Sequence, residues 1–185
     1  MNPIGTRREL HSGSQQRGAI LVVSLILLLI MTILALTVSQ TSRMQERMAG
    51  NARDSDLSFQ AAEAGLRGAE TYLTSQTSQP VACSGASCEV FQKDVLPADL
   101  RAQDPITFWD ARATEYGTGP NDLGGTGGVS RNPQYVIEEL GFIPDSLTVG
   151  KGVPSGRTYY KNTAHGFGGT QSAQTVVEST YTRRY

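Results

Sequence analysis

The chain has 185 residues, with 16 Lys and Arg against 17 Asp and Glu, so its formal net charge is −1. This balance excludes a general nucleic-acid-binding surface, which would need an excess of basic residues. With 38% hydrophobic and 18% charged residues, the composition is that of a folded protein, and the length suits one domain with an appendage.

An apolar segment near the N-terminus decides the class of the protein. Of the 20 residues from Ala19 to Val38, 17 are apolar, and no charge occurs between Arg17 and Arg43. Twenty helical residues span roughly 30 Å, the thickness of the hydrocarbon core of a bilayer. Three Arg against one Glu precede the segment, so the positive-inside rule keeps the N-terminus in the cytoplasm. We therefore expect a single membrane span, with everything after Val38 exported.

Gly18 lies at the boundary between the charged leader and this apolar segment. No small-residue cleavage site of the signal-peptide type follows the segment, so we expect the helix to continue into water. At Gly18, a membrane-embedded peptidase could cut before the hydrophobic segment and leave it attached to the exported part.

Beyond the apolar segment the pattern becomes one-sided, which predicts a single helix from about Ala19 to Leu73. At 100° per residue, eight residues share one apolar stripe that we expect to face a core: Met44, Met48, Ala52, Phe59, Ala62, Leu66, Ala69 and Leu73. Gly65 and Gly68 lie in the same helix, where they either allow close packing or are only tolerated.

The stretch from about Gln15 to Glu70 resembles the N-terminal region of PilX-type minor pilins of the type IV pilus. The segments QERMAGN and FQAAE carry this resemblance, together with the leader that ends in Gly18. The resemblance implies cleavage after Gly18 by the prepilin peptidase and methylation of the new amine on Ala19. It also implies an α+β lollipop, in which a long N-terminal helix packs on a small antiparallel sheet as an αβ-roll. The expected domains are a leader (1–18), a transmembrane and filament-core helix (19–43) and a periplasmic head (44–185).

Two positions depart from the general pilin pattern. Ala19 stands where major pilins usually carry Phe, and Val23 stands where most pilins carry a Glu that pairs with the amine of a neighbouring subunit. A buried charge without a partner is costly, so a subunit with Val23 leaves that pairing slot empty. In the family this absence goes with the filament tip, and we expect the protein to belong to a tip or priming complex.

The resemblance also implies partners and a location. The partners are other minor pilins, the major pilin, a PilY-type tip adhesin, the prepilin peptidase and the inner-membrane assembly platform. The location is the bacterial inner membrane and then the pilus, where the protein supports biogenesis, twitching motility and surface attachment. Two alternatives stay open: a K-like minor pseudopilin of type II secretion, and a single-pass anchored exported binding domain.

The head begins with a polar loop that contains the only two cysteines, Cys83 and Cys88. On the exported side we expect them to form a disulfide, rather than a metal half-site or a redox pair, because C-x4-C is not the redox spacing and no His is near. Asp104 and Pro105 then predict a helix start. The glycine-rich stretch from Gly117 to Ser130 predicts a long loop, exposed rather than ligand-binding.

The last third predicts an antiparallel meander of three strands, rich in Val, Ile, Tyr and Thr: Gln134 to Leu140, Arg157 to His165 and Thr175 to Arg183. No catalytic or metal motif accompanies His11 or His165, and Asp122 alone supplies too few carboxylates for a calcium loop. We expect no enzyme activity and no cofactor. Without residues 1–18 the chain holds 13 basic and 16 acidic residues, a net charge of −3, which disfavours nucleic acid as a partner.

Overall fold

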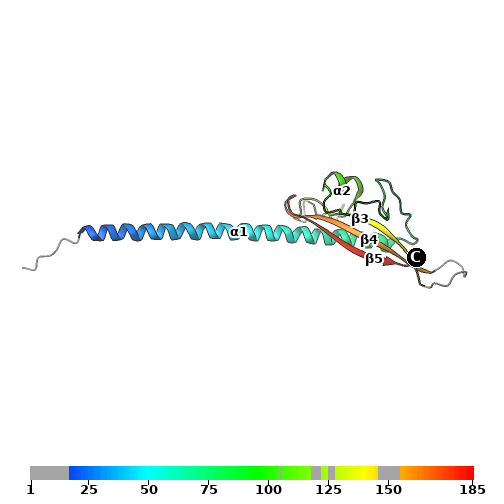
Figure 1. Ribbon diagram of the computed structural model, residues 1–185, viewed down its shortest axis with the longest axis horizontal. Helices are drawn as coiled ribbons and strands as arrows, with labels where there is room; N and C mark the ends of the chain where they lie inside the picture. The colour runs from blue at the N-terminus through cyan, green and yellow to red at the C-terminus, as the bar shows by residue number, and fades with distance from the viewer. Residues whose placement is uncertain (1–16, 105, 118–121, 125–127, 146–154) are drawn as a thin grey trace, which may run out of the picture. The chain divides into compact units, whose positions relative to one another are not determined.

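The structure is a computed structural model that describes residues 17–104, 106–117, 122–124, 128–145 and 155–185. A single long helix, α1 (Arg17–Ser75, 59 residues), precedes all strands, and this confirms the predicted helix from about Ala19 to Leu73 (Figure 1). The contacts divide the chain after Met48 into two units, Met1–Met48 and Ala49–Tyr185. Each unit is described separately below.

In the first unit, every described side chain from Gly18 to Met48 is exposed. The most apolar 18-residue window of the helix has a mean hydropathy of 3.2, and α1 is, among the described residues, the one helix that by length and composition could span a membrane. Its hydroxyl groups bond to the helix itself: Ser24 Oγ donates to the Leu21 carbonyl at 2.9 Å, and Thr32 Oγ1 to that of Leu29 at 2.8 Å. These hydroxyls therefore present no unpaired donor to a hydrocarbon environment.

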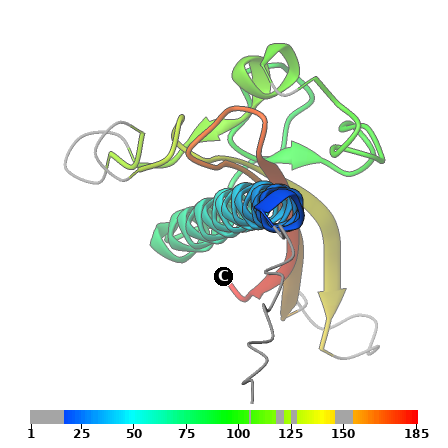
Figure 2. The ribbon, with the colours of Figure 1, turned by 90° about the vertical axis from the view of Figure 1, so that its left-hand side faces the viewer.

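The second unit is built on a sheet whose three long strands form the predicted antiparallel meander. They are β3 (Gln134–Pro144), β4 (Gly156–Phe167) and β5 (Gln174–Arg183), in the spatial order β3-β4-β5. The α-helical segment from residue 49 onward covers one face of this sheet, and α2 (Thr107–Arg112) lies toward the other (Figures 1 and 2). The α+β class is confirmed.

Two short strands, which the sequence did not predict, complete the sheet at its other edge. β1 (Phe91–Gln92) pairs in parallel with β3, and β2 (Thr114–Glu115) pairs with β3 in antiparallel. The sheet is therefore mixed, with the order β1-β3-β4-β5. The register between β3 and β4 shifts at a bulge between Glu139 and Gly141, after which the pairing resumes and continues to Pro144.

Glu138 of β3 fixes the turn that follows β1. The residue is 4% exposed, and its carboxylate accepts the Asp94 N–H at 2.8 Å and pairs with Lys161 Nζ at 2.8 Å. Asp94 has a positive φ of 64°. The buried carboxylate thus stabilises a left-handed turn residue and neutralises a cation from the neighbouring strand.

The prediction that the apolar stripe of α1 faces a core is confirmed for only half of its residues. Ala62, Leu66, Ala69 and Leu73 are buried under the sheet, whereas the other four members, Met44, Met48, Ala52 and Phe59, are exposed. The buried face also contains small residues that carry little hydrophobic weight: Ser58, Ala61, Gly65 and Gly68. The centre of the contact face is therefore rotated by roughly 60° from that of the predicted stripe, at 100° per residue. Met44 and Met48 are exposed for another reason, because they belong to the first unit.

This rotation has a steric reason, since the small residues let the sheet approach the helix closely. A Cβ added at Gly166 of β4 would lie 2.3 Å from the Ala62 nitrogen and 2.4 Å from the Ser58 carbonyl oxygen. A Cβ at Gly65 would lie 3.1 Å from that of Ala164, and one at Gly68 only 2.5 Å from the Tyr116 ring. Of the two roles left open for Gly65 and Gly68, close packing is the one that the structure supports.

Where the contact between α1 and the sheet begins, Thr170 in the β4–β5 turn donates hydrogen bonds to Asp54 of the helix. The Asp54 carboxylate accepts the Thr170 N–H at 3.1 Å and the Thr170 hydroxyl. Ser58 Oγ and Thr175 Oγ1 lie 2.6 Å apart one turn further along. The hydroxyl and amide donors lower the pKa of Asp54 below its ordinary value, so the carboxylate is charged at neutral pH.

The face of the sheet opposite α1 carries a second core around α2. Trp109 is 1% exposed, and it packs with Phe91, Leu96, Leu100, Phe108 and Val136. The predicted disulfide between Cys83 and Cys88 is present at the border of this core, with a Cα–Cα distance of 5.8 Å. It closes the loop that leads into β1, where Gln92 donates its N–H to the Cys83 carbonyl at 3.0 Å.

Candidate functional site: the N-terminal helix

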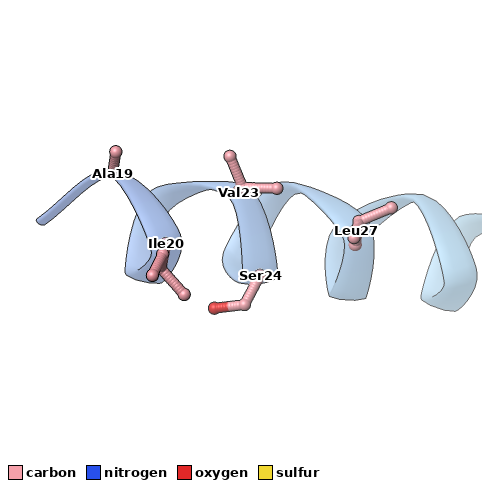
Figure 3. A pocket seen from close by; sticks show the side chains of 5 residues that line it. All are labelled: Ala19, Ile20, Val23, Ser24 and Leu27. Carbon is pink, nitrogen blue, oxygen red and sulfur yellow. The ribbon is translucent and has the colours of Figure 1, made fainter. Parts of the chain in front are cut away.

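The predicted processing and assembly residues lie in the first two turns of α1. The helix begins at Arg17, so Gly18 and Ala19 belong to its first turn and Val23 to its second. Ala19, Val23 and Leu27 project from the same side of the helix, as their spacing of four residues requires (Figure 3). A Cβ at Gly18 would meet no atom within 4 Å among the described residues. The leader (1–16) and His11 lie outside the described residues.

A shallow groove of about 500 Å³ follows this side of the helix and is lined by Ala19, Ile20, Val23, Ser24 and Leu27 (Figure 3). Its one polar side chain is Ser24, whose hydroxyl already donates to a helix carbonyl. No acidic residue occurs in the sequence between Glu9 and Glu46. The groove therefore offers apolar contact and no group that could neutralise a cation.

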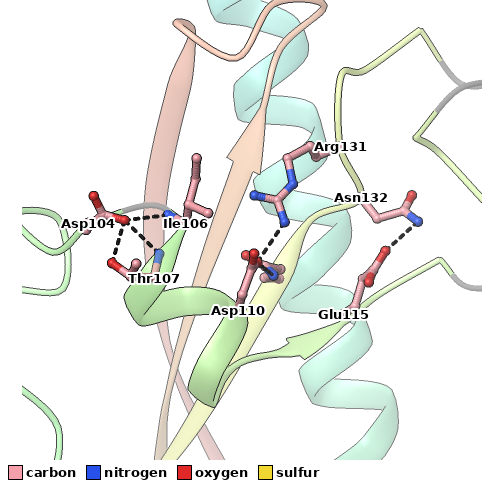
Figure 4. A network of polar contacts seen from close by, with 8 residues as sticks. Asp104, Ile106, Thr107, Asp110, Glu115, Arg131 and Asn132 are labelled. Carbon is pink, nitrogen blue, oxygen red and sulfur yellow. Dashed lines mark hydrogen bonds and ion pairs between the residues drawn. The ribbon is translucent and has the colours of Figure 1, made fainter.

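A polar network fixes the loops above the sheet in the head (Figure 4). Asp110 accepts from Arg131 Nη2 and from Gln134 Nε2, both at 2.7 Å, and Asn132 donates to Glu115 at 2.8 Å. The Asn132 side-chain oxygen in turn accepts the Leu123 and Gly124 N–H groups. These bonds anchor Leu123 and Gly124 of the glycine-rich stretch; residues 118–121 and 125–127 lie outside the description.

The same figure shows how α2 begins (Figure 4). The Asp104 carboxylate accepts the N–H groups of Ile106 at 2.9 Å and Thr107 at 2.7 Å. The predicted N-cap at Asp104 is wrong by two residues, because α2 begins at Thr107 and its N-cap is Ile106. Asp104 instead holds the turn before the helix, and Pro105 lies outside the described residues. The Thr107 donors lower the pKa of Asp104 below its ordinary value.

His165, the head residue with the most catalytic potential by type, is buried among aromatic rings. Its ring centre lies 5.0 Å from that of Trp109 and 4.4 Å from that of Phe167. Among the described residues, no group of three or more His, Cys, Asp or Glu side chains could hold a metal ion. The environment of His165 is that of a core residue.

This burial makes the stability of the head depend on pH. Burial lowers the pKa of His165 below 6.5, and it outweighs a hydrogen bond with Gln174 that raises this pKa. The charge of Arg131 lowers it further, and that of Asp110 raises it. Below about pH 6.5 the unfolded chain binds a proton that the folded chain resists, so stability falls with falling pH, by at most about 1.4 kcal/mol per pH unit. Denaturant unfolding of the chain in detergent between pH 7.5 and 5 should show this slope in the free energy of unfolding. The substitution His165→Gln should reduce the slope. An equal slope in both proteins would contradict the prediction.

Two family models match the chain. The first, PilX N-terminal, matches residues 17–67, and the second, type IV pilus assembly protein PilX C-term, matches residues 60–183. The chain belongs to the PilX family of type IV pilus assembly proteins. The two matches overlap within α1, so together they cover the apolar helix and the head of this PilX protein. No curated protein and no solved structure matches the chain.

Membership in the PilX family assigns the chain to type IV pilus assembly, and the PilX families are structural pilins rather than enzyme families. It also implies contacts with other pilus components in general. Two features of this PilX head were not predicted from the sequence. They are the small-residue contact face of α1 and the buried Glu138 carboxylate that bonds to Asp94 and Lys161. The spacing of Ser58, Ala61, Gly65 and Gly68 was the available signal for the contact face.

Proposed function

We propose that the chain is a minor pilin that helps to prime a type IV pilus and is incorporated at or near its tip. The observation that carries this proposal is the exposed apolar half of α1, which continues without a break into a helix that packs on an α+β head. Exposed apolar surface of this extent needs lipid or neighbouring helices around it. Such a segment can be held in the inner membrane first and by other subunits afterwards, with the head in the periplasm.

Processing between Gly18 and Ala19 is the first step of this function. The bond lies in the first turn of α1 as described from Arg17 onward, and the first turn of a helix has fewer intrahelical hydrogen bonds than its interior. Local unwinding there therefore breaks few backbone hydrogen bonds, which supports the access of a membrane-embedded peptidase. The mature chain would begin at Ala19, whose amine the peptidase methylates.

Intact-mass measurement of the membrane-extracted protein tests this step. Cells with an active prepilin peptidase are expected to yield a chain that begins at methylated Ala19, and cells without the peptidase a chain that retains residues 1–18. The leader contains three of the 16 basic residues, so the mature form also has a more acidic isoelectric point. The same uncut mass in both strains would leave an anchored exported binding domain as the function.

A place at the tip follows from charge. The new amine of Ala19 lies at the positive end of the helix dipole, and a cation there is unfavourable unless a carboxylate is near. A subunit with Val23 offers no such carboxylate to the amine of its neighbour, so it fits best where no further subunit requires that pairing. The proposed partners are other minor pilins, the major pilin, a PilY-type adhesin and the inner-membrane platform, and the proposed roles extend to twitching motility and surface attachment.

A K-like pseudopilin of type II secretion shares this chemistry. The family matches favour the pilus, because both models describe PilX proteins and the second names type IV pilus assembly.

A further inference from the structure

The outer edge of β5 pairs with no other described strand. β5 is the last strand in the order β1-β3-β4-β5, and no described strand pairs with its outer side (Figure 1). Its register with β4 is unbroken from Gln174 to Arg183, and its sequence, QTVVESTYTR, contains no Pro, Gly or Lys. Natural sheets usually protect such an edge with a bulge, a Pro, an inward charge or a covering segment. At the other edge, β1 and β2 pair with β3 at Gln134, Tyr135, Glu138 and Glu139, and the rest of that strand contains a bulge, Gly141 and Pro144.

The hydrogen-bond pattern identifies the backbone groups that point outward. Gly168 donates its N–H to the Ala173 carbonyl at 2.8 Å, which makes these two residues a hydrogen-bonded pair at the start of the β4–β5 ladder. Bonded and non-bonded pairs alternate along an antiparallel ladder. The odd-numbered residues of β5 therefore bond to β4, and the even-numbered ones present their N–H and C=O groups outward: Gln174, Val176, Glu178, Thr180 and Thr182.

A groove lies between the exposed flank of α1 and this edge. It has a volume of about 640 Å³ and is lined by Arg67, Glu70, Thr71, Thr74, Ser75 and Tyr181. Thr74 Oγ1 and the Tyr181 hydroxyl lie 3.0 Å apart, which joins the helix to β5 at this point. A strand added to β5 would place alternate side chains over this groove and the others beside the exposed Glu178.

We propose that β5 is the docking edge for one extended strand of another pilus subunit. The row of outward N–H and C=O groups defines the chemistry of the occupant, because an extended polypeptide matches such alternating donors and acceptors. The mixed charges of Arg67 and Glu70 favour polar side chains on the helix side, and Glu178 favours Lys or Arg on the other side. This proposal rests on the proposed function as a pilin, which supplies the subunit class of the partner.

Photo-cross-linking of the full-length chain in piliated cells tests the proposal. A benzoylphenylalanine at Thr182 is expected to cross-link to an extended segment of another pilus subunit, identified by mass spectrometry of the linked peptide. Adding Thr180→Pro removes one outward N–H and should reduce the cross-link about fivefold or more, as expected for a lost hydrogen bond at an edge. The matched variant Thr180→Val keeps the N–H and should keep the cross-link.

Neither variant touches the bonds between β5 and β4, so both should melt within a few degrees of the parent chain. Amide hydrogen exchange gives a measurement without substitutions: the N–H groups of Val176, Glu178 and Thr180 should exchange fast in the detergent-held chain and slowly in assembled pili.

Three results would overturn the proposal. They are a cross-link that Thr180→Pro leaves unchanged, a cross-link only to a second copy of this chain, and the absence of any cross-link together with equal exchange in both states. A chain that is processed and piliated but gives one of these results refutes the docking edge alone. A chain that is never processed refutes the pilin function instead.

Discussion

Replacing Gly166 by Ala is expected to destabilise the head by about 3 kcal/mol or more. The added Cβ would lie 2.3 Å from the Ala62 nitrogen and 2.4 Å from the Ser58 carbonyl oxygen. Both contacts are with helix backbone, so no side chain can rotate away, and the sheet must separate from α1. Denaturant unfolding of the full chain in detergent, followed by circular dichroism, measures the loss.

Gly50→Ala is the matched control for this substitution. A Cβ at Gly50 meets no atom within 4 Å, and the residue lies inside α1. Ala is the better helix former by up to about 1 kcal/mol, so this variant should be as stable as the parent chain or slightly more stable. Equal stability of Gly166→Ala and Gly50→Ala would show that the helix does not lie as close to β4 as the structure places it.

Replacing Val23 by Glu is expected to redistribute the protein within pili. If the missing carboxylate keeps the subunit at the tip, supplying it lets the next subunit pair its amine and the chain enter the shaft. A charge pair 4 Å apart at an effective dielectric of 20 is worth about 4 kcal/mol, and 1.4 kcal/mol already changes an equilibrium tenfold. The ratio of this chain to the major pilin in sheared pili should therefore rise about tenfold or more.

Val23→Gln serves as the control, because it has the size and polarity of Glu without the charge. It should leave the ratio at the parent value, with processing after Gly18 intact in both variants. If Val23→Glu leaves the ratio of this chain to the major pilin unchanged, the missing carboxylate does not determine where the subunit lies in the pilus. A rise with both variants would assign the effect to polarity in the helix rather than to charge.

Much of the fold follows from patterns that the sequence carries over short distances. The long helix is predicted by an uninterrupted apolar run followed by a one-sided pattern, and the three long strands by their β-branched and aromatic residues. β1 and β2 have two residues each, which is too short for any periodicity to appear, and they exist because β3 offers them an edge. Their pairing is a tertiary effect that local propensity does not encode.

The face of α1 shows where hydrophobicity misleads. The predicted stripe weights Phe59 heavily, yet Phe59 is exposed and the sheet packs on Ala61 and Gly65, whose small side chains allow a close approach. The proposed processing residues come from a leader, a Gly and an apolar run, which are linear features of the sequence, and their role stays a prediction. The unpaired edge of β5 could not be predicted from the sequence, because it depends on which strand is outermost in the folded sheet.

The close contact between α1 and the sheet also has a mechanical consequence. Contacts pair Ser58 with Thr175 near one end of the contact and Thr74 with Tyr181 near the other, so the head is held along several turns of the helix. A pull along the helix axis therefore loads these contacts in parallel, as shear, instead of opening them one after another. Together with the hydrogen bonds between Asp54 and Thr170, this arrangement resists a pull along the helix axis without peeling the sheet from the helix.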